Sequence, residues 1–200
     1  MDNYYDPSPL LVLRRPLTLV SYPEAGHRMV GYQLAARTGL PFVDLDRATE
    51  HEAGMNQWQV LQEHGEEGLR QLEIRSLDRA LRQPLPAIIS LGDRTLMHAP
   101  NLERVLAESD LVYLHFDLAN YYWHLRKLEE SRGRLTHPFL PHPLDSIDAL
   151  RPVVDARAPG FQRAPHRQEL AGQHPAKIAQ RLQRELLPLL STTAVGALNP

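Results

Sequence analysis

The chain has 200 residues, a length typical of one domain, and its 42% hydrophobic and 23% charged residues are typical of a globular protein. The 22 basic and 24 acidic residues give a net charge of −2, which argues against a nucleic-acid binder, and the lack of cysteine excludes disulfides and thiolate sites. No run approaches the roughly 18 apolar residues of a membrane span. The N-terminus also lacks the basic start of a secretory signal, so we expect a cytoplasmic protein.

Short runs of β-forming residues alternate with helical periodicity along most of the chain. Residues 1–16 are rich in proline and are predicted to be an irregular extension, followed by a single domain over 17–190 and a flexible tail over 191–200. The expected strands are 17–22, 41–46, 87–91, 111–116 and, with the weakest pattern, 166–171. The expected helices are 26–38, 58–64, 68–81, 102–106, 119–130 and 175–190.

This alternation predicts a three-layer α/β/α domain, in which helices cover both faces of a parallel sheet. Ligands of such sheets bind beyond the carboxyl ends of the strands. We therefore expect residues 21–28, 44–46 and 92–94 to converge on one site. Residues 131–145 are rich in proline and lack periodicity, which predicts a loop that acts as a lid over the site.

The first strand, turn and helix have the setting of a phosphate-binding loop, whose pattern is Gly-x-x-x-x-Gly-Lys-Ser/Thr. In residues 21–28, Gly26 keeps the second glycine, but most of the other positions depart from what ATP and Mg²⁺ require. The departures are Ser21 in place of glycine, Pro23 without an N–H for phosphate, Glu24 with a negative charge, His27 in place of lysine, and Arg28, which cannot ligate a cation. The motif is therefore interpreted as a degenerate Walker A loop.

The segments that follow resemble the shikimate kinase family. GLPFVDLD, EAGMNQWQVLQEHGEEGLRQLE and AIISLG continue the pattern to about residue 94, and a looser likeness extends to the C-terminal helix. The resemblance implies a P-loop kinase-like domain with a five-stranded parallel sheet. It implies that Asp46 binds substrate hydroxyls and acts as the base in an active enzyme, with Asp44 near the metal. It also implies that Arg70 and Arg157 bind the shikimate carboxylate, and that Glu73 could orient Arg70.

Two further motifs of the family differ in this chain. The glycine triplet after the third strand reads Gly92-Asp93-Arg94, of which Gly92 remains a ligand-binding candidate. Asp93 and Arg94 either fill the pocket, which we favour, or Arg94 adds a third cation. In the lid, His137 stands where the family has an arginine, although Arg134 is near.

Three hypotheses for the function follow. The first is a pseudoenzyme that has lost ATP-dependent phosphorylation, needs no cofactor and binds a small acidic molecule, such as a shikimate-like or aromatic carboxylate. The second is an active shikimate kinase of aromatic amino acid biosynthesis, which transfers phosphate from ATP to the 3-hydroxyl of shikimate with Mg²⁺. The third is a scaffold that binds a protein partner through the aromatic cluster Tyr121–Trp123 and the N-terminal extension. The ten histidines show no metal-binding spacing, so we expect no histidine metal site.

Overall fold

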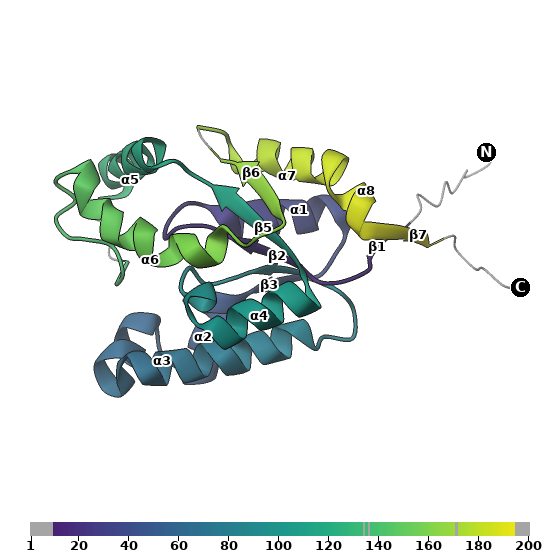
Figure 1. The fold of residues 1–200 in the computed structure, drawn as a ribbon, viewed down its shortest axis with the longest axis horizontal. Helices are drawn as coiled ribbons and strands as arrows, with labels where there is room; N and C mark the ends of the chain where they lie inside the picture. The colour runs from purple at the N-terminus through teal and green to yellow at the C-terminus, as the bar shows by residue number, and fades with distance from the viewer. Residues whose placement is uncertain (1–9, 134, 136, 171, 195–200) are drawn as a thin grey trace, which may run out of the picture.

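A computed structural model describes residues 10–133, 135, 137–170 and 172–194 (Figure 1). Its strands in chain order are β1 (Leu10–Leu13), β2 (Leu17–Val20), β3 (Phe42–Asp44), β4 (Ile88–Ser90), β5 (Asp110–His115), β6 (His166–Glu169) and β7 (Ser191–Ala194). Its helices are α1 (His27–Thr38), α2 (Leu45–Ala53), α3 (Gln57–Leu81), α4 (Ala99–Glu108), α5 (Leu118–Arg132), α6 (Arg151–Phe161), α7 (Pro175–Glu185) and α8 (Leu187–Leu190). Two short 3₁₀ helices are η1 (Thr95–Met97) and η2 (Ile147–Leu150).

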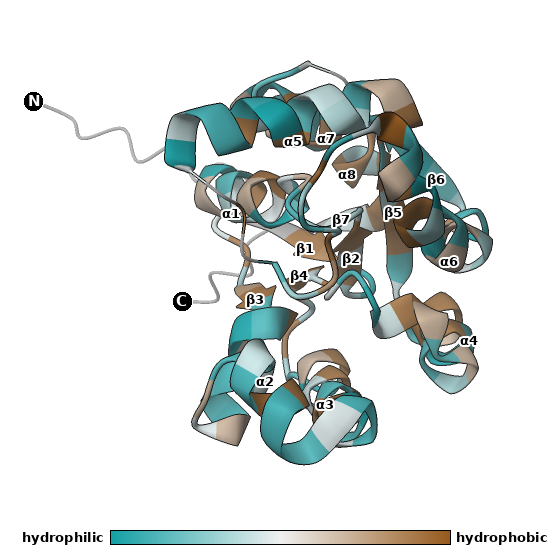
Figure 2. Cartoon of the chain, turned by 90° about the vertical axis from the view of Figure 1, so that its left-hand side faces the viewer, coloured by the Kyte–Doolittle hydropathy of each residue, from teal (hydrophilic) through white to brown (hydrophobic). Residues whose placement is uncertain are grey.

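A parallel sheet in the order β3-β4-β2-β5-β6 forms the centre of the molecule. Its central strands are mostly apolar because both faces of the sheet are covered: Leu17, Leu19, Ile88, Ile89 and Val112 are fully buried. Figure 2 shows this apolar centre between more hydrophilic helices. The predicted five-stranded parallel sheet is confirmed, including its weakest member at residues 166–169.

Helices cover both faces of the sheet. The helices α1 and α7 pack together on one face, whereas α3 and α4 lie on the other (Figure 1). The three-layer α/β/α architecture is thereby confirmed. The two helices predicted over 58–64 and 68–81 are the two helical parts of α3, which meet at a kink at Gly65, where the backbone is not helical and φ is +65°. Glycine suits this position because φ is positive there.

The strand predicted over 41–46 ends earlier than expected. Asp44 closes β3 and its carboxylate accepts a hydrogen bond from the Arg47 N–H at 3.2 Å, so it caps α2. Asp46 therefore lies in the first turn of a helix that we did not expect. We also did not expect α6, because its sequence contains Pro152 and Pro159, and proline usually argues against a helix. Pro152 lies in the first turn, where a helix tolerates proline.

The two ends of the chain differ from the expected irregular extension and flexible tail. Residues 10–13 pair antiparallel with residues 191–194, which forms a small second sheet that no local sequence signal predicted. The rest of both segments, residues 1–9 and 195–200, lies outside the described residues. No helix in the described part of the chain is both long and apolar enough to cross a membrane.

The contact of α6 with η1 depends on the absence of a side chain at Gly160. A Cβ placed there would lie 2.7 Å from the carbonyl oxygen of Leu96 and 3.2 Å from its Cβ. This close approach brings α6 against the segment that follows β4.

We predict that Gly160→Ala destabilises the protein. Helix propensity alone would make alanine stabilising by about 1 kcal/mol. The clash with a backbone oxygen costs about 1–3 kcal/mol instead, so the net change should be a loss. Urea unfolding measures it, and a raised unfolding free energy in the variant would contradict the close packing.

Candidate functional site

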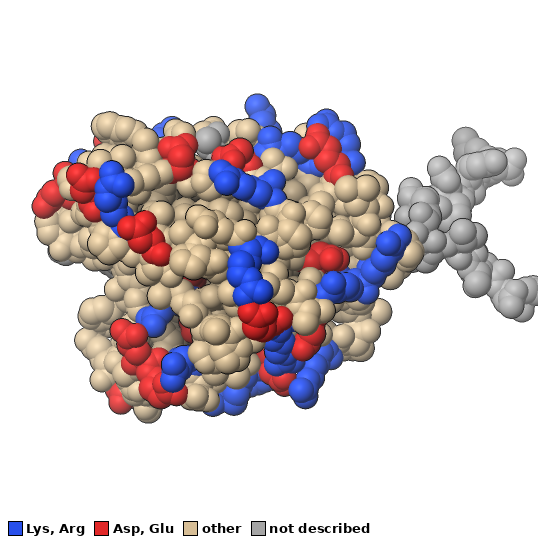
Figure 3. All heavy atoms as spheres, in the orientation of Figure 1, with Lys and Arg blue, Asp and Glu red and all other residues tan. Residues whose placement is uncertain are grey.

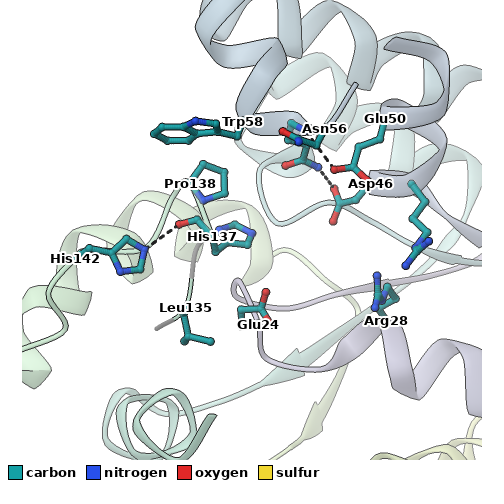
Figure 4. Close-up of a pocket in the computed structure, with 12 residues that line it drawn as sticks. Glu24, Arg28, Asp46, Glu50, Asn56, Trp58, Leu135, His137, Pro138 and His142 are labelled. Atoms are coloured by element: carbon teal, nitrogen blue, oxygen red, sulfur yellow. Dashed lines mark hydrogen bonds between the residues drawn. The ribbon is translucent and has the colours of Figure 1, made fainter. Parts of the chain in front are cut away.

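A cleft of about 870 Å³ lies at the carboxyl ends of the central strands, as expected for a parallel sheet (Figure 4). Its size is in the range of small-molecule sites. The residues that line it come from the loop after β2, from α1, from α2 and α3, and from the segment 135–142. They are Glu24, Arg28, Asp46, Arg47, Glu50, Asn56, Gln57, Trp58, Leu135, His137, Pro138 and His142.

Asp46 is one of three acidic residues that line this cleft, with Glu24 and Glu50. Its Oδ1 accepts a hydrogen bond from Gln57 Nε2 at 2.8 Å, and a Cβ at Gly92 would lie 2.5 Å from the same oxygen, so the glycine lets the strand end approach the acid. Burial, together with the nearby charges of Asp93 and Asp44, raises the pKa of Asp46 to about 8. At neutral pH this group is therefore mostly protonated and can donate a hydrogen bond.

Arginine side chains surround Asp44, where the resemblance implies a metal. Arg28 Nη1 lies 3.5 Å and Arg47 Nε lies 3.8 Å from Asp44 Oδ2. In the described part of the chain, no three His, Cys, Asp or Glu side chains group in a way that could hold a metal ion. The charged groups beside Asp44 are thus the guanidiniums of Arg28 and Arg47.

The loop over residues 21–26 is held by side chains of the protein. Ser21 is fully buried and donates a hydrogen bond to the carbonyl of Leu114 in β5 at 2.6 Å. The Tyr121 hydroxyl of α5 donates to the carbonyl of Pro23 at 2.7 Å, and His124 Nε2 lies 2.9 Å from the carbonyl of Glu24. These contacts fix the loop at its base and along its α5 side.

His27 does not supply the charge that lysine would. Its residue is 7% exposed, and burial lowers its pKa, so the ring is neutral at pH 7. Its Nε2 lies 2.9 Å from the carbonyl oxygen of Leu91, which only accepts, so Nε2 carries the proton. The side chain therefore ties α1 to the end of β4.

Arg157 is buried against Asp93. Arg157 Nε donates to Asp93 Oδ2 at 2.7 Å, Nη2 donates to the same oxygen, and Nη1 donates to the Val153 carbonyl at 2.9 Å. His137 Nε2 lies 3.8 Å from Asp93 Oδ1, and burial lowers the pKa of His137. The predicted substrate-binding arginine is thus paired with an internal carboxylate, which agrees with the interpretation that Asp93 fills the pocket.

Arg70, Glu73 and Arg94 differ from their expected positions. Arg70 is on the exposed side of α3 and pairs with Glu67 one turn earlier, so it does not join Asp46 in the cleft. Glu73 is buried, makes no ion pair with a described residue, and has its pKa raised by burial to about 7. Arg94 pairs with Glu66 at 3.0 Å and lies 4.2 Å from the Phe139 ring centre. Arg134 lies outside the described residues.

The sequence analysis missed the part of the cleft formed at the start of α3. Asn56 and Gln59 form a reciprocal capping box, and Gln57, the first residue of the helix, bonds to Asp46. The sequence Asn-x-x-Gln is a recognisable helix-start signal, so this boundary was available from the sequence. Trp58, which is 54% exposed beside the cleft, carried no such signal.

Comparison with known proteins gives one consistent family. The family model described as shikimate kinase matches residues 23–187. A shikimate kinase of Xanthomonas campestris pv. campestris (strain 8004) is 31% identical over 157 residues, which cover 78% of this chain and 79% of that relative. One of Symbiobacterium thermophilum is 30% identical and covers 75% and 83%.

Solved structures agree in fold. The shikimate kinase from Acinetobacter baumannii in complex with shikimate matches with a TM-score of 0.75 and 23% identity, over 88% of this chain and 94% of that one. The shikimate kinase from Bacteroides thetaiotaomicron matches with a TM-score of 0.74 and 23% identity, over 87% and 97%. At these identities the matches establish the fold.

Tyr121→Phe tests whether α5 holds the loop. The substitution removes the donor to the Pro23 carbonyl, and we expect a loss of about 1 kcal/mol of unfolding free energy. Tyr122→Phe is the matched control because Tyr122 is a half-buried residue whose hydroxyl makes no hydrogen bond with a described residue. Equal effects of the two variants in urea unfolding would show that the bond does not stabilise the loop.

The raised pKa of Asp46 predicts a pH dependence of stability. The folded state keeps a proton that the unfolded chain releases near pH 4, so the Asp46 contribution is full below pH 4 and is lost as pH rises toward 8. The unfolding free energy of Asp46→Asn relative to the original chain should therefore rise over this window by about 1 kcal/mol or more. Chemical denaturation at pH 4.5 and pH 8 measures it; a difference that is constant or falls would contradict the assignment.

Proposed function

Because this chain belongs to the shikimate kinase family, we propose that its cleft binds a small hydroxylated acid of the shikimate type, without transferring phosphate from ATP. The observation that carries the proposal is the contrast between the two halves of the site. The half formed by α2 and α3 keeps an acid and an amide that can bind hydroxyls, Asp46 and Gln57. The half formed by the loop after β2 has lost the groups that bind phosphate and metal.

The ligand-binding half offers matched chemistry for such an acid. Asp46, protonated at neutral pH, and the Gln57 amide provide hydrogen-bond donors and acceptors for ligand hydroxyls. Arg28 and Arg47 line the same cleft, with side chains 52% and 73% exposed, and can pair with an anionic group. The related protein from Acinetobacter baumannii that holds shikimate supports this class of ligand.

The residues present do not fit ATP with Mg²⁺ in the manner of a phosphate-binding loop. The neutral, buried His27 supplies no cation for phosphate oxygens. Arg28 places a guanidinium beside Asp44 where a hydroxyl ligand to the metal would be required. Pro23 has no N–H, and Glu24, with φ of +55°, adds a negative charge to the loop. These features support the proposal that the protein binds its ligand without using ATP.

The alternative is an active shikimate kinase that transfers phosphate from ATP to the 3-hydroxyl of shikimate. The comparisons favour it, since the curated relatives reported above carry that name. On this alternative, Asp46 would be the base for the hydroxyl. The two functions differ in one measurable property, which is turnover of ATP.

The proposed function predicts a shikimate-dependent rise in the melting midpoint without ATP. At 100 times Kd the gain would be about 2.7 kcal/mol. It also predicts no shikimate-dependent ADP release in the presence of ATP and Mg²⁺. Turnover of ATP with shikimate would establish the alternative, and no effect of shikimate or related hydroxylated acids would contradict the ligand class.

A loop-restored variant makes the test specific. Ser21→Gly, Pro23→Gly, Glu24→Ala, His27→Lys and Arg28→Ser together should create ATP binding measurable by calorimetry. The control, His27→Ala with Arg28→Ala, changes two of the same positions without restoring the lysine or the hydroxyl, and should bind no ATP. Micromolar ATP binding by the original chain would overturn the proposal for the loop.

A further inference from the structure

All three nitrogens of the Arg157 guanidinium make hydrogen bonds within the protein. Its Nε and Nη2 both donate to Asp93 Oδ2, and its Nη1 donates to the carbonyl of Val153. Both residues of the pair are 5% exposed. A ligand carboxylate that binds Nε and Nη2 of Arg157 together would have to displace the aspartate.

The fold holds Asp93 in place from two sides. Gly92 brings the backbone before it against Asp46, and the Thr95 N–H donates to the Gly92 carbonyl at 3.1 Å, which turns the chain after β4. On the other side, the contact of Gly160 with Leu96 fixes α6, which carries Arg157. The pair therefore joins two elements that are already packed together.

Breaking this pair is costly. A charge-assisted bond between buried groups is favourable only while both partners are present, and removal of one leaves the other desolvated and unpaired. An incoming carboxylate would regain the bond to Arg157, but it would leave Asp93 buried without its partner. Displacement of Asp93 by a ligand of the same charge is thus unfavourable.

Neighbouring cations do not replace Arg157. Arg94 is held by Glu66 and by the Phe139 ring, and Arg70 is paired with Glu67 on the outer side of α3. Arg28 and Arg47 are the guanidiniums that line the main cleft. An anionic ligand group would consequently bind on the α1 and α2 side of Asp46.

We propose that Asp93 is a specificity-determining residue: its carboxylate permanently occupies the Arg157 guanidinium, so the site does not use Arg157 to select a carboxylate ligand. This inference rests on the proposed function for the location of the ligand. The position facing Arg157 then takes an uncharged part of the ligand.

The test compares shikimate with its methyl ester, in which the carboxylate charge is replaced by a neutral ester that is one methyl group larger. Affinities are measured by calorimetry for the original chain, Asp93→Gly and Asp93→Asn. Freeing Arg157 should raise the preference for shikimate over methyl shikimate at least tenfold relative to the original chain. The asparagine variant keeps the shape of the side chain and serves if the glycine variant does not fold.

The gain must depend on Arg157 itself. The double variant Asp93→Asn with Arg157→Met carries neither charge and should return to the preference of the original chain. An unchanged preference in the folded Asp93 variants, or no binding of shikimate to them, overturns the inference. Failure of the proposed function is read separately, as no effect of shikimate on the original chain while the Asp93 variants gain binding.

Chemical rescue gives a second measurement without a cleft ligand. Acetate has the carboxylate that Asp93→Gly deletes, so it should raise the melting midpoint of that variant more than that of the original chain. Acetamide, of similar shape but uncharged, is the control. Equal effects of acetate on both proteins would mean that Arg157 does not retain an anion site, which overturns the inference.

Discussion

The ion pair between Arg157 and Asp93 connects the two parts of the molecule that form the site. Asp93 follows β4 in the sheet, whereas Arg157 belongs to α6, which packs against η1. Because both charges are buried, each requires the other, and the mutual position of the sheet edge and α6 is fixed by this requirement. Burial is the main cause of the raised pKa values of Asp46 and Glu73, and the charge of Asp93 raises both further. The protonation of the cleft thus also depends on this carboxylate.

Side chains of the protein hold the loop after β2 at several points. A phosphate-binding loop directs backbone N–H groups toward an anion, which gives them a partner. Here the buried contacts are made instead by side chains: Ser21 to β5, Tyr121 to the Pro23 carbonyl and His27 to the end of β4. Charged groups are distributed over the surface without one large patch of either sign in the view of Figure 3.

Local patterns were sufficient to predict the sheet and most helices. Strands of a parallel sheet that are buried on both faces have mostly apolar sequences, so β2, β4 and β5 could be located. The helices α1, α3 and α5 could be located from their helical sequence patterns. The pairing of residues 10–13 with 191–194 could not, since it depends on a contact between the ends of the chain. The same holds for Arg70: a nearby Glu67 on the same helix competes for its guanidinium, and no motif shows which carboxylate pairs with it.

The separation of the two halves of the site explains how one could change while the other was kept. Asp46 and Gln57 are positioned by α2 and α3, whereas Pro23 to Gly26 belong to the turn between β2 and α1, and His27 and Arg28 begin α1. Asp44 caps α2 through the Arg47 N–H and Asn56 caps α3 through the Gln59 N–H, so both caps are made within their own segments. On the proposed function, a family member can lose the groups that hold a nucleotide and still position an acid and an amide for ligand hydroxyls, because α2 and α3 carry Asp46 and Gln57. Arg28, which lies 3.5 Å from Asp44, is a residue that both halves share.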